Sequence, residues 1–180
     1  MAYTFDENKV GLLQIANTDA GVTMANSSTT VPTLPAVLGM ICRAIDPTYG
    51  EGEFILLLGV ASTVVGSVVT YSPTTYQTTL SPNTANLSQP VAVAMSACTA
   101  GLFGWYQISG LAVVKKTAVK VDPAGTRRIY QSATAGRIMQ TSAAGKNILG
   151  AASANLTTVT STTSTVVCSI NRPHLQGPIT

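Results

Sequence analysis

Apolar residues along this chain fall into short runs separated by turn-forming residues, and no long segment repeats them with the helical period. The continuous apolar run at 54–61 fits a strand that is buried on both faces, with a short buried helix as the alternative that periodicity leaves open. A second run at 67–71 follows Gly66, and we expect the two runs to pair as a hairpin. Short runs between turn signals predict an all-β fold, a compact sandwich or barrel of short antiparallel strands.

The longest β-prone segment, 103–116, holds the only tryptophan and ends in two lysines. Successive side chains of a strand point to opposite faces. One face is predicted to be narrow and apolar, and it carries Tyr106, Ile108, Gly110, Ala112 and Val114. The other face is mixed and begins with Phe103 and Trp105. Because Trp105 and Tyr106 are neighbours, we expect one to lie in the core and the other outside it.

Turn signals divide the stretch from 122 to 150. Residues 122–125 read Asp-Pro-Ala-Gly, in which aspartate can bond its own backbone and proline pre-sets φ. Ala-Gly pairs recur at 135–136 and 144–145, and Gly150 is predicted to end the run that follows them. This spacing predicts a series of short strands with tight reversals.

The ends of the chain are predicted to be irregular. The polar segment 1–35 contains two closely spaced prolines, so we expect an extended N-terminal arm with one short strand near 12–16. The β-domain is expected at 36–173, followed by a tail at 174–180. The last strand is predicted at 164–170, with irregular backbone after it, and its side chains on one face are Val166, Cys168 and Ile170.

Charge is the part of the composition that changes this picture. Charged residues make up 9% of the 180 residues, against ~25% in typical soluble domains. A surface so poor in charge is weakly protected against association, so we expect a protein that works in an assembly with much of its surface covered. Six of the seven acidic residues lie at or before Glu53, whereas eight of the ten basic residues follow it. The two parts could attract each other within or between subunits, while the scatter of the basic residues argues against direct nucleic-acid binding.

The cysteines and the leader region bear on the compartment. Cys42, Cys98 and Cys168 are widely spaced, and the last two sit in apolar runs, which predicts small buried side chains and a reducing compartment during folding. The first residues lack the basic start and apolar core of a signal peptide. The longest apolar run is far shorter than the ~20 residues of a membrane span, so we expect no membrane partner.

Residues able to do chemistry do not converge in any familiar pattern. The single histidine, His174, lies in the tail without an evident orienting partner. Glu51 and Glu53 would share one face of a strand, which suits a paired-carboxylate or calcium site, but we favour a polar turn between strands. No cysteine nucleophile, closed metal site or phosphate loop is indicated. We therefore predict no catalytic residue, no metal and no cofactor, and a protein that is not an enzyme.

Several glycine-anchored motifs, spread over about residues 35–173, resemble small structural proteins of tailed bacteriophages, namely head-decoration or capsid cement proteins. The motifs lie at 47–55, 59–62, 93–96, 104–108, 134–136 and 144–150. The resemblance implies a β-rich virion protein, made in the host cytoplasm, that sits on the outer surface of the capsid. It also implies that the protein bridges neighbouring major capsid proteins against internal DNA pressure, as a homotrimer in preference to a homodimer.

Eight residues are candidates for the interface that such a protein needs: Tyr3, Phe5, Trp105, Tyr106, Lys115, Lys116, Arg127 and Arg128. The alternative is a receptor-binding or fibre-associated module of the virion, in which Tyr71, Tyr76 and the Trp105–Tyr106 pair could stack on sugars. A small hydrolase is a third possibility, which requires Glu51 and Glu53 to lie in a deep cleft near His174.

Overall fold

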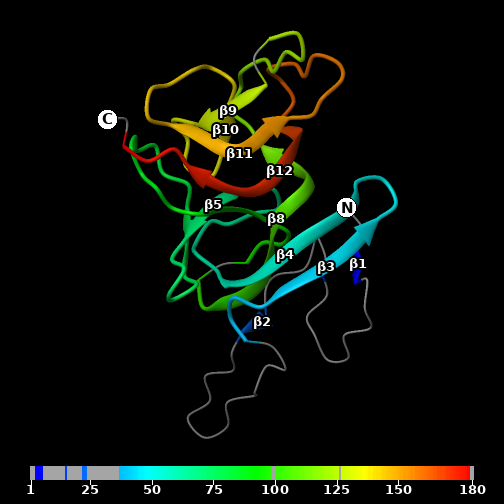
Figure 1. The fold of residues 1–180 in the computed structure, drawn as a ribbon, viewed down its shortest axis with the longest axis vertical. Coiled ribbons are helices and arrows are strands. Elements are labelled where there is room, and N and C mark those ends of the chain that lie inside the picture. The colour runs from blue at the N-terminus through cyan, green and yellow to red at the C-terminus, as the bar shows by residue number, and fades with distance from the viewer. Residues whose placement is uncertain are drawn as a thin grey trace, which may run out of the picture.

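The computed structural model describes residues 3–5, 15, 22–23, 37–98, 100–125 and 127–178. This described part of the chain is all-β and contains no helix (Figure 1). Its twelve strands are β1 (Thr4–Phe5), β2 (Val22–Thr23), β3 (Ile41–Asp46), β4 (Gly50–Leu58), β5 (Val68–Tyr71), β6 (Thr78–Leu80), β7 (Val91–Ala94), β8 (Leu102–Lys115), β9 (Arg128–Gln131), β10 (Ile138–Met139), β11 (Asn147–Ser153) and β12 (Thr165–Leu175). The all-β prediction is confirmed.

Strand β8 is the centre of a curled antiparallel sheet that forms a half-barrel. Ser109 pairs with Glu53 of β4 and also with Asn171 of β12, so these two strands lie on opposite edges of β8. Beyond β4 the sheet continues through β3 to β1, and beyond β12 it continues through β11 and β9 to β10. Strands β2 and β7 also pair with β8, and β7 carries β5 and β6. The predicted long strand at 103–116 is therefore the element on which the rest of the sheet is assembled.

The predicted hairpin between 54–61 and 67–71 is wrong. Strand β4 pairs with β3 and β8, whereas β5 pairs with β6 and β7. The turn before β4 is tight, because Asp46 Oδ1 accepts hydrogen bonds from the backbone N–H groups of Thr48 at 2.8 Å and Tyr49 at 3.0 Å. This Asx turn joins β3 to β4 and gives β4 its local antiparallel neighbour.

Both faces of β8 are covered, so the expectation that one member of the Trp105–Tyr106 pair lies outside is wrong. Trp105 is 2% exposed and packs in a cluster that includes Phe54 and Leu56. Tyr106 is fully buried on the opposite face, in a cluster that includes Leu57. The side chains alternate as predicted, but a separate apolar cluster receives each face.

The expected irregular backbone after 170 is wrong as far as Leu175. Strand β12 pairs with β11 through His174 and Leu175, and Leu175 is 1% exposed. Pro173 is accommodated because the register shifts at a bulge between Leu149 and Ala151. Gly150 lies in that bulge with φ of +71°, so it bends β11 instead of ending it.

The described residues of the N-terminal segment lie on the sheet, where β1 pairs with β3 and β2 pairs with β8. Tyr3 is 5% exposed; its hydroxyl donates to Leu111 O at 3.0 Å and accepts from Gln107 Nε2 at 3.3 Å. Burial raises the pKa of Tyr3 to about 12. Apart from Ile15, the predicted strand near 12–16 lies outside the described residues, as does most of the predicted arm.

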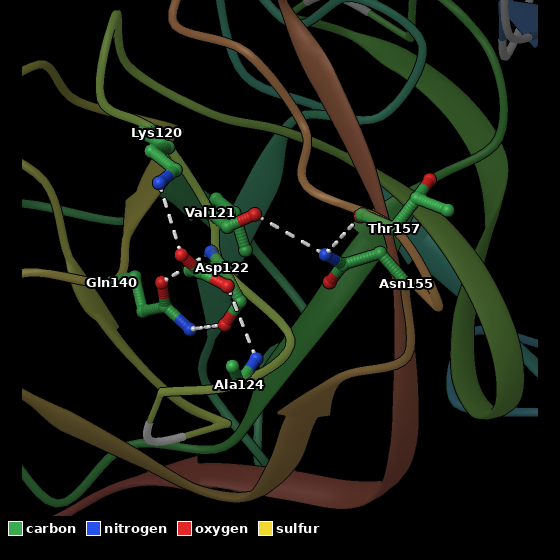
Figure 2. Close-up of polar contacts among 7 residues, drawn as sticks. All are labelled: Lys120, Val121, Asp122, Ala124, Gln140, Asn155 and Thr157. Carbon is green, nitrogen blue, oxygen red and sulfur yellow. Dashed lines mark hydrogen bonds and ion pairs between the residues drawn. The ribbon is translucent and has the colours of Figure 1, made fainter.

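Side-chain amides fasten the predicted turn at 122–125 to two other segments (Figure 2). Gln140 accepts from the backbone N–H of Asp122 at 2.8 Å and donates back to its carbonyl at 3.0 Å, which copies the pairing of a β-ladder. Asn155 Nδ2 donates to the carbonyls of Val121 at 3.2 Å and Thr157 at 2.9 Å. These bonds replace regular strand pairing where the chain leaves the sheet.

Candidate protein-binding face

The outward face of the β3–β4 hairpin combines apolar and charged side chains. Opposite residues of an antiparallel pair share a face, and the register places Ile45 opposite Glu51 and Arg43 opposite Glu53. Strand β3 alternates exposed and buried side chains, which leaves Ile41 42% exposed and Ile45 45% exposed. We call this surface, formed by Ile41, Arg43, Ile45, Glu51, Glu53 and Arg172, the hairpin face.

Two arginines hold the carboxylates of the hairpin face. Arg43 lies 3.5 Å from Glu51 (Nη1 to Oε1) and 3.6 Å from Glu53 (Nε to Oε1). Arg172 Nη2 donates to Glu53 Oε2 at 2.9 Å. The arginine side chains are about 60% exposed, so each pair adds little to folding stability. The network instead fixes the position of each charge on the surface.

The bulge in the β11–β12 pair positions Arg172. Arg172 has φ of +44°, a left-handed conformation that non-glycine residues rarely adopt. Gly150 approaches so closely that a Cβ there would lie 2.6 Å from Asn171 O. Bulges of this kind redirect a side chain, and here the redirected side chain reaches Glu53.

A shallow cleft of about 400 Å³ opens on the hairpin face, lined by Arg43, Glu51, Gly52, Glu53, Ser109, Asn171 and Arg172. Glu51 and Glu53 lie in strand β4 on one face, not in the polar turn that we favoured. Both carboxylates already face arginine, which argues against a cation site between them. Within the described chain, no group of three His, Cys, Asp or Glu residues could hold a metal ion.

His174 and the two glutamates line different hollows. His174 lines a smaller one of about 120 Å³ together with Tyr71 and Pro90. Arg172 lines both hollows. The structure therefore does not place these three residues in one deep cleft, which is the arrangement that a hydrolase requires.

Four of the eight predicted interface residues are buried within the protein, and for these the prediction is corrected: Tyr3, Trp105, Tyr106 and Lys116. The aromatic residues fill clusters on the two faces of the sheet, so they serve the core instead of a partner surface or a sugar. Burial also raises the pKa of the Tyr106 hydroxyl.

The other four predicted interface residues have different surroundings. Arg127 and Arg128 are exposed where β9 begins, and Lys115 is half-buried at the end of β8. Phe5 pairs through its backbone with Ala44, and its side chain lies outside the described part of the chain. None of these four belongs to the hairpin face.

Sequence reasoning singled out Glu51 and Glu53 but missed the other residues that form this face. The alternation Ile-Cys-Arg-Ala-Ile at 41–45 carried the signal, since every second position is a large side chain on one side of a strand. Arg172 carried no such signal, because its role depends on a bulge between strands joined by a long loop.

Lys116 is 1% exposed, and its ammonium donates to the carbonyls of Val119 at 2.9 Å and Thr117 at 3.2 Å. Removal from water lowers the pKa of Lys116. Between that lowered value and the ~10.4 of an unfolded lysine, the unfolded chain binds more protons. The contribution of Lys116 to the free energy of unfolding therefore increases as pH rises through this window.

We expect the free energy of unfolding of Lys116→Met to lie within about 1 kcal/mol of the wild-type value near the top of that window, because the folded wild type there holds a neutral buried lysine that an apolar chain can replace. The wild-type free energy of unfolding minus that of Lys116→Met should rise with pH up to ~10.4. Urea titrations at a series of alkaline pH values measure this difference. Lys115→Met controls for the added thioether, and a difference that stays constant with pH would contradict the assignment.

Among the described residues no helix is long and apolar enough to cross a membrane. Comparisons of the chain with protein-family models, with curated proteins and with solved structures give no match.

Proposed function

We propose that this protein is a structural component of a phage virion that binds the outer surface of the capsid. In this role it cements neighbouring major capsid proteins against internal DNA pressure, as a homo-oligomer and preferentially a homotrimer. The proposal rests on the motif resemblance of residues 35–173 and makes binding, not catalysis, the work of the chain.

The hairpin face is the structural observation that supports a protein-binding role. Exposed isoleucines with arginine beside them match the composition of protein interfaces, in which apolar side chains and arginine are enriched at the centre. Ile41 and Ile45 stand on either side of Arg43 on a single strand, so a partner could cover all three at once. The paired charges would then give orientation more than affinity.

We expect Ile45→Asp to weaken binding to undecorated heads by more than about 30-fold, because truncating a central apolar contact alone costs about 2 kcal/mol and the aspartate adds a desolvation penalty. Cosedimentation of purified protein with heads measures this affinity. Val64→Asp is the matched control, since Val64 is 42% exposed against 45% for Ile45 and lies in a turn outside the hairpin face.

Equal binding by the two variants would contradict a role for the hairpin face. The alternative of a receptor-binding or fibre-associated module is separated by copy number in purified virions. A cement protein should approach the major capsid protein in abundance, whereas a fibre module should be far scarcer. Burial removes Trp105 and Tyr106 from the four aromatic residues on which sugar stacking was based, whereas Tyr71 and Tyr76 are half-buried.

A further inference from the structure

Besides the hairpin face, the molecule has a second charged region, and its net charge is strongly positive. Residues 115–146 contain seven basic residues and a single acid, Asp122, which gives the segment a formal charge of +6. The segment runs from the end of β8 through β9 and β10 to the start of β11. In Figure 1 these elements gather at the end of the molecule opposite β2. We call this region the basic lobe.

The acids that the structure describes are engaged, and all but one of them lie outside the basic lobe. Glu51 and Glu53 face Arg43, and Arg172 also holds Glu53. Asp46 accepts the two backbone N–H groups of its own turn. The three remaining acids, at positions 6, 7 and 19, lie outside the described residues.

Within the basic lobe the only acid is already used. Asp122 Oδ2 lies 3.0 Å from Lys120 Nζ, and its other oxygen accepts from the N–H of Ala124 at 3.1 Å. Lys146 meets a neutral partner, donating to Asn83 Oδ1 at 2.6 Å. Arg127 is exposed, and Arg137 is half-buried. Lys116 is buried and Lys120 is paired, so the positive charge at the surface of the lobe comes from its five other basic residues, and a partner can meet this charge.

We infer that the basic lobe docks onto an acidic protein surface, which on the proposed function is a surface of the major capsid protein. This inference rests on the proposed function for the identity of the partner and on the charge of the lobe for its chemistry. Opposite fields across an interface speed encounter and reject wrongly charged partners. The lobe would thus select and orient the partner, while the hairpin face supplies apolar contact.

Nucleic acid is the other polyanion that a positive surface could meet, and the structure favours protein. The only aromatic residue within 115–146 is Tyr130, which is 7% exposed and offers bases no stacking platform. Lys115, Arg137 and Lys146 are half-buried and so are held close to the surface. The basic residues of the lobe also occur singly or in pairs along the chain, without the longer run that favours nucleic-acid binding.

The test compares two variants that lower the net charge equally. Arg127→Gln with Arg137→Gln removes two positive charges from the basic lobe. Thr75→Glu with Thr79→Glu adds two negative charges at exposed positions in and before β6. Binding to undecorated heads, to immobilised polyglutamate and to duplex DNA is measured at ionic strengths of about 0.01 M and about 0.15 M, which shorten the Debye length from ~30 Å to ~8 Å.

For the wild type we expect association with heads and with polyglutamate to slow at the higher ionic strength. The glutamine variant should associate about 10-fold more slowly than the wild type at low ionic strength, and the glutamate variant should stay close to it. Equal rates for the two variants would overturn the inference. Tighter binding to DNA than to polyglutamate would overturn it in favour of nucleic acid.

If the proposed function is wrong, the binding measurements give a different pattern from the one that contradicts the inference. The capsid role is rejected if the wild-type protein does not bind heads but binds polyglutamate, and if the glutamine variant binds polyglutamate more weakly. This result would retain the acidic-protein site. Wild-type protein that binds neither heads nor polyglutamate would overturn the inference itself.

Discussion

Trp105→Ala is expected to lower the free energy of unfolding by about 3–5 kcal/mol. The side chain is 2% exposed and packs in the cluster with Phe54, Leu56 and Met95, so truncation loses apolar contact and leaves a cavity in the middle of the sheet. Domains of this size are stable by about 5–15 kcal/mol in total, so the loss is a large part of that stability. Urea denaturation followed by circular dichroism measures the change, because the variant has no tryptophan to report by fluorescence.

Two further variants make this result interpretable. Trp105→Phe keeps most of the apolar volume and should cost clearly less than Trp105→Ala, which keeps the comparison possible if the alanine variant does not fold. Leu156→Ala removes a side chain that is 87% exposed and should leave stability within about 0.5 kcal/mol. A loss below about 1 kcal/mol for Trp105→Ala would contradict the role of Trp105 in the core.

Gly110→Ala is expected to cost about 3 kcal/mol or more. Gly110 has φ of +97°, which strains any residue with a side chain, and an added Cβ would lie 2.5 Å from Glu51 O. The nearby backbone of Gly52 is 3.1 Å from the same Cβ, so the clash is with main chain that cannot rotate away. The substitution would push β8 away from β4, on which the hairpin face is built.

Gly101→Ala separates the two causes of this cost. Gly101 has a similar positive φ of +78°, but an added Cβ there meets nothing within 4 Å. Its substitution should therefore show the backbone strain alone, about 1 kcal/mol. Thermal unfolding of both variants measures the difference, and equal losses would show that the approach of β4 to β8 is not the limiting contact.

The sequence alone indicated the basic lobe more fully than it indicated the hairpin face. The excess of basic residues after Glu53 is visible in the sequence, and the two glutamates were predicted to share a face if they lay on a strand. Their arginine partners were not predicted. Arg43 meets Glu53 through the register of β3 and β4, and Arg172 comes from a strand more than a hundred residues later.

The sequence by itself determined the local properties of this protein. Alternation along 103–116, the turn at 122–125 and the shared face of Val166, Cys168 and Ile170 all appear in the structure, because each depends on neighbouring residues alone. The tertiary structure decided which strands pair and which faces are covered. The strands that pair with β8 come from distant segments of the chain. A strand face that appears exposed from its own sequence can therefore be buried by side chains of other strands.

That difference explains the changed view of Trp105 and Tyr106. Their opposite directions follow from strand geometry, but the covering of both sides required clusters assembled from β3, β4, β5 and β7. The hairpin face arose in the converse way. The outward isoleucines of β3 remain exposed because no described segment packs over them.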